Sequence, residues 1–206
     1  MNNTTKKTRK LVEIAMLGAV AAILMYFEFP LPFIAPPFYE IDLSEVPVLI
    51  GTFALGPLAG VAIEFIKIPL KLMMKGTTTV FVGDIANFFI GCAFVLPAGW
   101  IYRKHKTKKH ALAGMVLGTV SMTVLGCFIN AYILLPFFAA AQKMPIDAII
   151  EMGSAVNSHI VSVPTFVMIA VAPFNLIKGF IVSLITLLLY KHVSPSLKGS
   201  NYSVSS

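Results

Sequence analysis

Long apolar runs, separated by short clusters of lysine and arginine, are the feature that most restricts how this chain can fold. Runs of about 20 apolar residues are long enough to cross a bilayer as helices. With 57% hydrophobic and 12% charged residues and a mean hydropathy of +0.85, the 206-residue chain is too apolar for a soluble domain of its size. The sequence therefore predicts an all-α integral membrane protein.

The positions of the basic residues predict how the chain is oriented. Most of the 16 lysines and arginines lie in segment 6–10, before the first apolar run, in segment 103–109, or after the last run at Lys191 and Lys198. Basic residues gather in the cytoplasmic loops of membrane proteins. Six transmembrane helices with cytoplasmic N- and C-termini place all these residues on one side. The net charge of +7 then reflects basic residues in the cytoplasmic segments beside the lipid bilayer, and no nucleic acid partner is expected.

Three segments follow from this topology. We expect a cytoplasmic basic N-terminus at 1–10, a six-helix membrane domain at 11–192 and a cytoplasmic polar tail at 193–206. The first helix is expected at 11–29. A secretory signal also begins with a basic segment, but this run is long enough to span the membrane and further spans follow it.

Small residues, including Ala15 and Ala19, form a smooth stripe along the first helix. Such a stripe lets another helix approach closely. It suits docking of a partner, or packing against helices of the same chain.

A proline-rich outer loop and a short helix follow. Segment 30–43 contains four prolines, which exclude a continuous helix. It is either a rigid connector or a lid over a pocket, with Phe38 and Tyr39 as its apolar contacts. The second helix, from its cap at Ser44 to Leu55, is too short to span unaided. Short or interrupted helices often mark binding sites in transport proteins.

The later helices carry polar residues. We expect helices at 57–74, 83–102, 111–141 and 173–190, a short surface helix within 142–158, and a shallow or re-entrant piece at 160–172. In the third helix Glu64 and Lys67 are expected to form an ion pair, whereas Lys71 has no obvious local partner. The other polar residues of interest in these helices are Asp84, Asn87, Asn130, Asn175 and Lys178.

These polar residues are expected at one depth. Helices 3 and 5 run outward and end near Lys71 and Asn130, while helices 4 and 6 run inward and begin near Asp84 and Asn175. A lysine at mid-membrane costs roughly 2.5 to 3.5 kcal/mol on insertion scales, so Lys178 needs a partner, a cavity or a ligand. The residues predict either a pocket that opens outward or a buried polar network. Asparagine amides both donate and accept, which suits a neutral ligand with amide edges and hydroxyls.

Motifs for other functions are missing from the sequence. It has no phosphate-binding GxxxxGK[ST] loop, no HExxH and no GxSxG, so neither ATP hydrolysis, nor metal catalysis, nor an enzyme activity is expected. Cys92 and Cys127 lack metal-binding spacing and are expected to be packing residues.

Five ordered segments resemble one known family. They are Glu40–Pro47 (EIDLSEVP), Gly56–Gly60 (GPLAG), Val82–Phe88 (with VG and ANF), Asn130–Pro136 (NAYILLP) and Pro173–Gly179 (PFNLIKG). Together they resemble the riboflavin-specific S component, the substrate-binding subunit, of energy-coupling factor (ECF) vitamin transporters.

The resemblance implies capture of riboflavin outside a bacterial cell, as a transported ligand and not as a cofactor. It also implies a transmembrane coupling subunit and two cytoplasmic ATPase subunits as partners. The family's flavin-binding residues carry over to Asn130 and Lys178, and its helix-docking motif to Ala15 and Ala19. The substrate site is then predicted to contain Asn130, Lys178, Asn175, Asn87, Lys71, Asp42, Tyr39 and Asp84.

Two alternatives stay open at this point. One is an S component for another vitamin, such as thiamine or pantothenate. The other is a membrane enzyme or assembly protein that uses the polar residues as a structural network.

Overall fold

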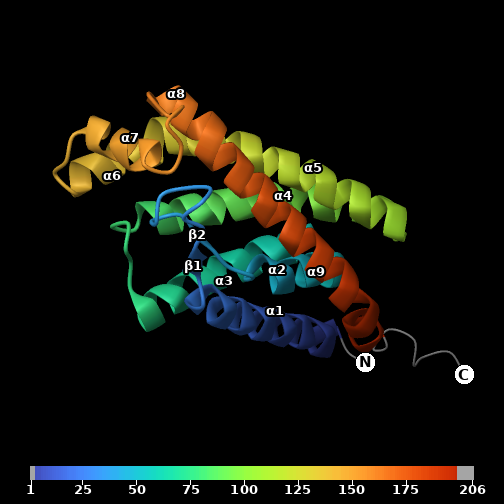
Figure 1. Cartoon of the computed structure of the whole chain (residues 1–206). Coiled ribbons are helices and arrows are strands. Elements are labelled where there is room, and N and C mark those ends of the chain that lie inside the picture. Colours follow the sequence, from blue (N-terminus) through green and yellow to red (C-terminus); the bar gives the residue numbers. More distant parts are fainter. Residues whose placement is uncertain (1–2, 199–206) are drawn as a thin grey trace, which may run out of the picture.

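The computed structural model describes the backbone of residues 3–198 and the side chains of residues 4–189. Long helices lie roughly alongside one another, with α9 crossing the others (Figure 1). The end of the predicted polar tail, from residue 199, and the side chains of Lys191 and Lys198 lie outside the described residues. The principal helices are α1 (Asn3–Tyr26), α2 (Glu45–Leu55), α3 (Pro57–Lys75), α4 (Val82–Lys104), α5 (Lys108–Ile129) and α9 (Ala172–Lys198).

Three helical stretches in the described residues are long and apolar enough to cross a membrane: Val82–Lys104, Lys108–Ala141 and Val163–Leu189. Helices α1, with 24 residues, and α3, with 19, are also long, but they carry more charged side chains. Helix α2 has only 11 residues, so the prediction of a short second helix is confirmed.

The fifth expected helix is one helical stretch with a widened turn. Helix α5 continues through the π-helical turn η1 (Asn130–Leu134) into α6 (Leu135–Ala141). In this turn the Leu135 N–H donates to the carbonyl of Asn130, five residues earlier. Pro136 has no N–H and crowds the preceding turn, which the wider turn accommodates. The short surface helix expected within 142–158 is α7 (Ile146–Ser154).

The expected start of the last helix at Pro173 is wrong. The helix begins at α8 (Val163–Phe166) and continues through the π-helical turn η2 (Val167–Val171) into α9. Ser162 and Thr165 form a capping box at this earlier start. The Ala172 N–H donates to the Val167 carbonyl, so the wider turn carries the helix past Pro173. Segment 163–172 is therefore not a separate re-entrant piece.

The fold also departs from all-α in one place. Two short strands, β1 (Phe29–Pro30) and β2 (Glu40–Ile41), pair antiparallel, with Phe29 opposite Ile41. This pairing closes the two ends of the proline-rich loop, which lies among the helices (Figure 1). Ala35 and Ile41 of the loop are buried, so it is packed into the helical bundle.

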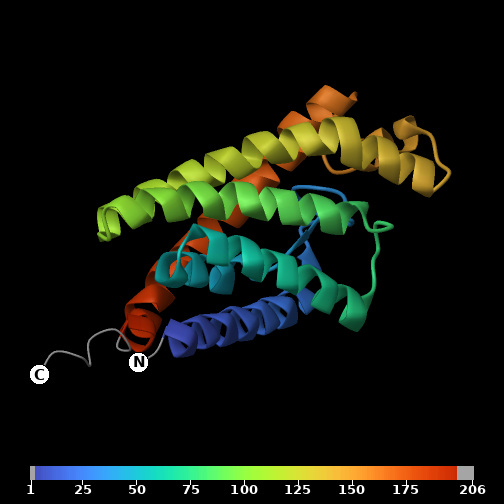
Figure 2. The same ribbon diagram turned by 180° about the vertical axis from the view of Figure 1, so that it is seen from behind.

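The two ends of the bundle differ. The start of α1, the turn between α4 and α5 and the last described turns of α9 lie at one end (Figures 1 and 2). We call this the basic end, because it carries Lys6 to Lys10 and Arg103 to Lys109. The paired strands, the α3–α4 connection and helices α6 to α8 lie at the other end, which we call the loop end (Figure 2).

Candidate ligand-binding site

A cavity of about 120 Å³ lies near the loop end, among α3, α4, η1, α9 and the loop between α1 and α2. The structure brings together nearly all of the predicted site residues around it. Asp42 is the exception, because it does not line the cavity. The predicted residues that line it are Tyr39, Lys71, Asp84, Asn87, Asn130, Asn175 and Lys178.

Asp42 instead holds Lys178 in place. The Lys178 ammonium donates to Asp42 Oδ2 at 2.9 Å, and Asp42 Oδ1 accepts from the Ser44 N–H at 2.7 Å. Both side chains are buried, with relative exposures of 1% for Asp42 and 7% for Lys178. Burial raises the pKa of the Asp42 carboxyl, but the ammonium groups of Lys178 and Lys67 outweigh it and hold that pKa below its usual range. Lys178 therefore reaches the cavity already paired.

Asn130 is oriented by two hydrogen bonds. The Tyr39 hydroxyl donates to Asn130 Oδ1, and Asn130 Nδ2 donates to the Gly126 carbonyl at 2.7 Å. Burial raises the pKa of the Tyr39 phenol, so the hydroxyl keeps its proton and acts as the donor. Each bond uses only part of the capacity of the amide. Asn130 therefore presents one more N–H and one more lone pair in a fixed orientation.

Buried acceptors next to the cavity lack partners. Asn87 Oδ1 and Asp84 Oδ2 are buried and accept no hydrogen bond from the chain over its described side chains. Both residues line the cavity. An unpaired buried acceptor costs about 1–3 kcal/mol, so a ligand that donates to these atoms would gain by satisfying them.

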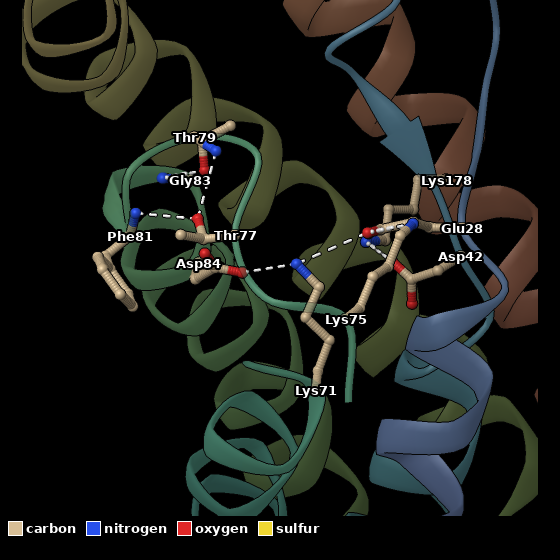
Figure 3. Close-up of polar contacts among 10 residues, drawn as sticks. All are labelled: Glu28, Asp42, Lys71, Lys75, Thr77, Thr79, Phe81, Gly83, Asp84 and Lys178. Atoms are coloured by element: carbon tan, nitrogen blue, oxygen red, sulfur yellow. Dashed lines mark hydrogen bonds and ion pairs between the residues drawn. The ribbon is translucent and has the colours of Figure 1, made fainter. Parts of the chain in front are cut away.

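An ionic network of residues that include Glu28, Lys71 and Asp84 lies on the cavity wall (Figure 3). Lys71 lies 2.9 Å from Asp84 Oδ1 and 3.6 Å from Glu28 Oε1, and Lys75 lies 2.9 Å from the same Glu28 oxygen. These contacts join the link between α1 and β1 to α3 and α4. Lys71, which had no obvious local partner in the sequence, finds two through the fold.

Glu40 lies beside this network on β2. Burial and the neighbouring Glu28 carboxylate raise the pKa of the Glu40 carboxyl above its usual value. Glu40 and Glu28 both line the cavity, so they place two carboxyl groups on its wall.

Aromatic side chains from the loop cover the cavity. The Phe38 ring stacks on Phe138 with centroids 5.0 Å apart, and the Tyr39 ring lies 5.6 Å from that of Phe174. Sites for drug-sized ligands usually measure roughly 300–1,000 Å³, which exceeds this cavity. Phe38 and Tyr39 both line the cavity, so their positions limit its volume.

The predicted Glu64–Lys67 ion pair is present, and it belongs to a larger buried cluster. Lys67 Nζ lies 3.0 Å from Glu64 Oε1, 2.6 Å from Glu45 Oε1 and 3.0 Å from the hydroxyl of Ser44. Ser44 does precede α2, but its hydroxyl binds Lys67 and does not cap the helix. The cluster ties the short α2 to α3. The structure thus contains both a buried polar network and a cavity.

Sequence reasoning missed several lining residues. Glu28 was not predicted, although a carboxylate at the end of a long apolar run is a detectable signal, and Glu40, in the proline-rich loop, was named only as part of the family resemblance. Met25 and Met122 give no such signal, because an apolar residue in an apolar helix looks the same whether it faces a cavity or lipid. The remaining lining residues that were not predicted as site residues are Phe38, Glu45, Thr78, Thr79, Gly83, Ala86, Ile90, Gly91, Leu134 and Phe174.

The described residues contain no cluster of three or more histidine, cysteine or carboxylate side chains that could hold a metal ion. Cys92 and Cys127 are free thiols. The polar groups that line the cavity can form hydrogen bonds with a ligand, and the aromatic rings that line it can stack on a ligand ring.

The sequence around this cavity matches a known protein family over most of the chain. The family described as "ECF transporter, substrate-specific component" matches residues 9–190. The chain belongs to this family. As an S component it is a multi-pass protein of the cell membrane and part of a transporter, not an enzyme.

Several relatives of this S component have names that state a substrate. It is 33% identical to the "Riboflavin transporter FmnP" of Bacillus subtilis over 190 residues, which cover 92% of this chain and 94% of that protein. It is 31% identical to the "Riboflavin transporter RibU" of Staphylococcus aureus over 193 residues, 94% of each chain.

A solved structure resembles this S component over nearly its whole length. That structure is described as "Structure and mechanism of the S component of a bacterial ECF transporter". It is 32% identical in sequence, with a TM-score of 0.72, and the match covers 93% of this chain and 99% of the other. The observed fold is therefore that of the family.

Proposed function

We propose that this S component binds riboflavin in the cavity near the loop end and delivers it to an ECF transport complex. The observation that carries the proposal is the gathering of Asn130, Asn175 and Lys178 around one cavity. The relatives named as riboflavin transporters support the choice of ligand. Riboflavin would be cargo in this reading, and no cofactor takes part.

The chemistry of riboflavin suits the groups on the cavity wall. Its ring system has an imide edge of alternating acceptors and a donor, which matches the free N–H and lone pair of Asn130 and the amide of Asn175. Its ring faces are flat and apolar, which suits stacking on Phe174 and Tyr39.

The ribityl chain of riboflavin carries hydroxyls that can both donate and accept. Asn87 Oδ1 and Asp84 Oδ2 are acceptors without partners among the described side chains, so they are suited to accept hydrogen bonds from these hydroxyls. Lys71 can donate to a hydroxyl oxygen. Asp42 takes an indirect role here, because both of its oxygens are used in holding Lys178 and the Ser44 N–H.

The loop that precedes α2 would act as a lid. A tricyclic ring needs more room than about 120 Å³, so Phe38 must separate from Phe138 as the ligand enters. The Asp42–Lys178 contact ties one end of the loop to α9, and the β1–β2 pairing closes its base. We expect the segment between these anchors, 31–39, to move.

Transport would need partners, namely a transmembrane coupling subunit and two cytoplasmic ATPase subunits. Ala15 is exposed on α1 and Ala19 is partly exposed, so the small-residue stripe is open to a partner helix. We also propose that six helices cross the membrane and that the basic end faces the cytoplasm of a bacterial cell, as its positive charge favours.

A binding titration tests this function. When riboflavin is titrated with the purified protein in detergent, binding should quench the flavin fluorescence, and the titration should give one site per chain. Asn130→Ala and Lys178→Ala should each weaken binding at least tenfold, whereas Asn157→Ala and Lys143→Ala, at exposed positions, should not. Unchanged affinity in both cavity variants would overturn the site. Binding of thiamine or pantothenate in place of riboflavin would overturn the ligand.

A further inference from the structure

A second cavity, of about 250 Å³, lies at the basic end. It is formed by the start of α1, the junction between α2 and α3, and the end of α4. Three of its lining side chains are basic: Lys10, Arg103 and Lys106. It lies far from the riboflavin cavity, which is lined by Met25 and Glu28 at the opposite end of α1.

The charge in this cavity is not balanced by its walls. None of its lining residues, all of which lie in the described part of the chain, is acidic. The acidic side chain nearest to Lys10 in the sequence, Glu13, already accepts from Arg9 at 2.8 Å. Helix α2 ends and α3 begins at Gly56, so their dipoles oppose each other there. The positive field therefore comes from the three side chains.

Lys10 is directed toward the cavity by its position on α1. It shares a helical face with Ile14 and Ala21, both of which are buried against the other helices. Ala15 and Ala19 lie on a different, more open face of the helix. The basic cavity is thus separate from the small-residue stripe proposed for the coupling subunit.

Exposed apolar side chains line the cavity or lie close in the chain to residues that line it. Leu58, which lines it, has 75% of its surface exposed, and Leu11 follows Lys10 with 66% exposed. Trp100 lies one turn before Arg103 on α4 and is 57% exposed. Tryptophan is enriched where a membrane protein passes from acyl chains to headgroups. In a membrane protein, these side chains face lipid.

We propose that this cavity binds the phosphate headgroup of an anionic phospholipid. Lys10, Arg103 and Lys106 surround the phosphate, and the acyl chains lie along Leu58 and Trp100. Basic pockets between transmembrane helices on the cytoplasmic side are suited to anionic headgroups. A free phosphate ion would satisfy the charges but not the apolar surface beside them.

Native mass spectrometry of the purified protein tests the proposal. Delipidated protein is titrated with short-chain phosphatidylglycerol, with phosphatidylcholine of the same chain length, and with phosphatidylglycerol in the presence of inorganic phosphate. We expect one phosphatidylglycerol to bind in preference to phosphatidylcholine. Millimolar inorganic phosphate should not displace it.

Two triple variants assign the site. Lys10→Gln/Arg103→Gln/Lys106→Gln removes the three basic lining side chains, and Lys104→Gln/Lys108→Gln/Lys109→Gln removes the same charge from neighbouring positions outside the cavity. At about fivefold per basic side chain, the first variant should lose roughly 100-fold in affinity for phosphatidylglycerol. The second should keep most of it. A thermal melt confirms that both variants are folded.

Three results would overturn the proposal. Equal losses in the two triple variants would mean that diffuse charge, not the cavity, attracts the lipid. Equal binding of phosphatidylglycerol and phosphatidylcholine would mean that the headgroup charge is not recognised. Full displacement by inorganic phosphate would assign the cavity to a free phosphate ion.

Discussion

Lys178 on α9 donates to Asp42 Oδ2 at 2.9 Å, although the two residues are 136 positions apart in the chain. This contact anchors the loop before α2 to the last helix. It also gives the amine a partner within the bundle before any ligand arrives.

Lys178→Met should destabilise the protein by about 3–5 kcal/mol, because it leaves the buried Asp42 carboxylate without its ion-pair partner. The double variant Asp42→Asn/Lys178→Met should recover part of that loss, since no buried charge remains. Chemical denaturation of the protein in detergent measures both. A Lys178→Met variant as stable as the wild type would show that the two groups do not depend on each other.

Tyr39→Phe should weaken riboflavin binding about fivefold to tenfold, because Asn130 loses the hydrogen bond that fixes its amide. Fluorescence titration gives the affinity. Tyr132→Phe is the matched control, because Tyr132 is nearby on η1 but 70% exposed. Equal affinities for the Tyr39 variant and the wild type would contradict an orienting role.

Asp84→Asn should lower the free energy of unfolding by about 1–3 kcal/mol. Lys71 then keeps only Glu28, at 3.6 Å, as a charged partner. Asp147→Asn, on the exposed side of α7, removes the same charge and should change stability little. If both variants melt at the same temperature, the Lys71–Asp84 pair contributes nothing to the bundle.

The stability of the protein should depend on pH through Glu40. The pKa of this carboxyl is raised in the folded state by burial and by Glu28, so the folded state binds a proton more tightly than the unfolded state. Its contribution is therefore favourable at low pH and is lost as pH rises from the ordinary glutamate pKa through the folded value.

Glu40→Gln should raise the melting temperature above this pH window and leave it nearly unchanged below. Thermal melts of the wild type and the variant between pH 4 and pH 8 measure the difference. The Asp42 carboxyl should stabilise the fold by a nearly constant amount over most of this range, because its lowered folded pKa gives a contribution that is lost only as pH falls from the ordinary aspartate pKa through the folded value. A difference in melting temperature that does not vary with pH would contradict the assignment to Glu40.

The sequence predicted the polar cavity better than the course of the last helix. Lys71, Asn130 and Lys178 could be placed at one depth because membrane thickness and loop charge fix where a residue lies along its helix. The predicted start of the last helix at Pro173 was wrong, because a proline interrupts a regular helix but is accommodated when a widened turn precedes it. The change from a four-residue to a five-residue hydrogen-bond spacing in such a turn cannot be recognised from the residue types.

The partners of the charged residues also required the fold. Glu28 lies just after α1, Lys71 in α3 and Asp84 in α4, and their sequence spacing carries no information about which carboxylate meets which ammonium. Likewise, nothing in the sequence alone indicates that Asp42 holds Lys178 and does not face the ligand.

What the sequence determined by itself was the class of protein, the spans expected of its apolar runs and the depth of its polar residues, because these depend on local composition and on the fixed thickness of a bilayer. The tertiary structure decided how those helices rotate and cross. Rotation determines whether a side chain meets a partner, a cavity or lipid, and it is set by contacts between residues far apart in the chain.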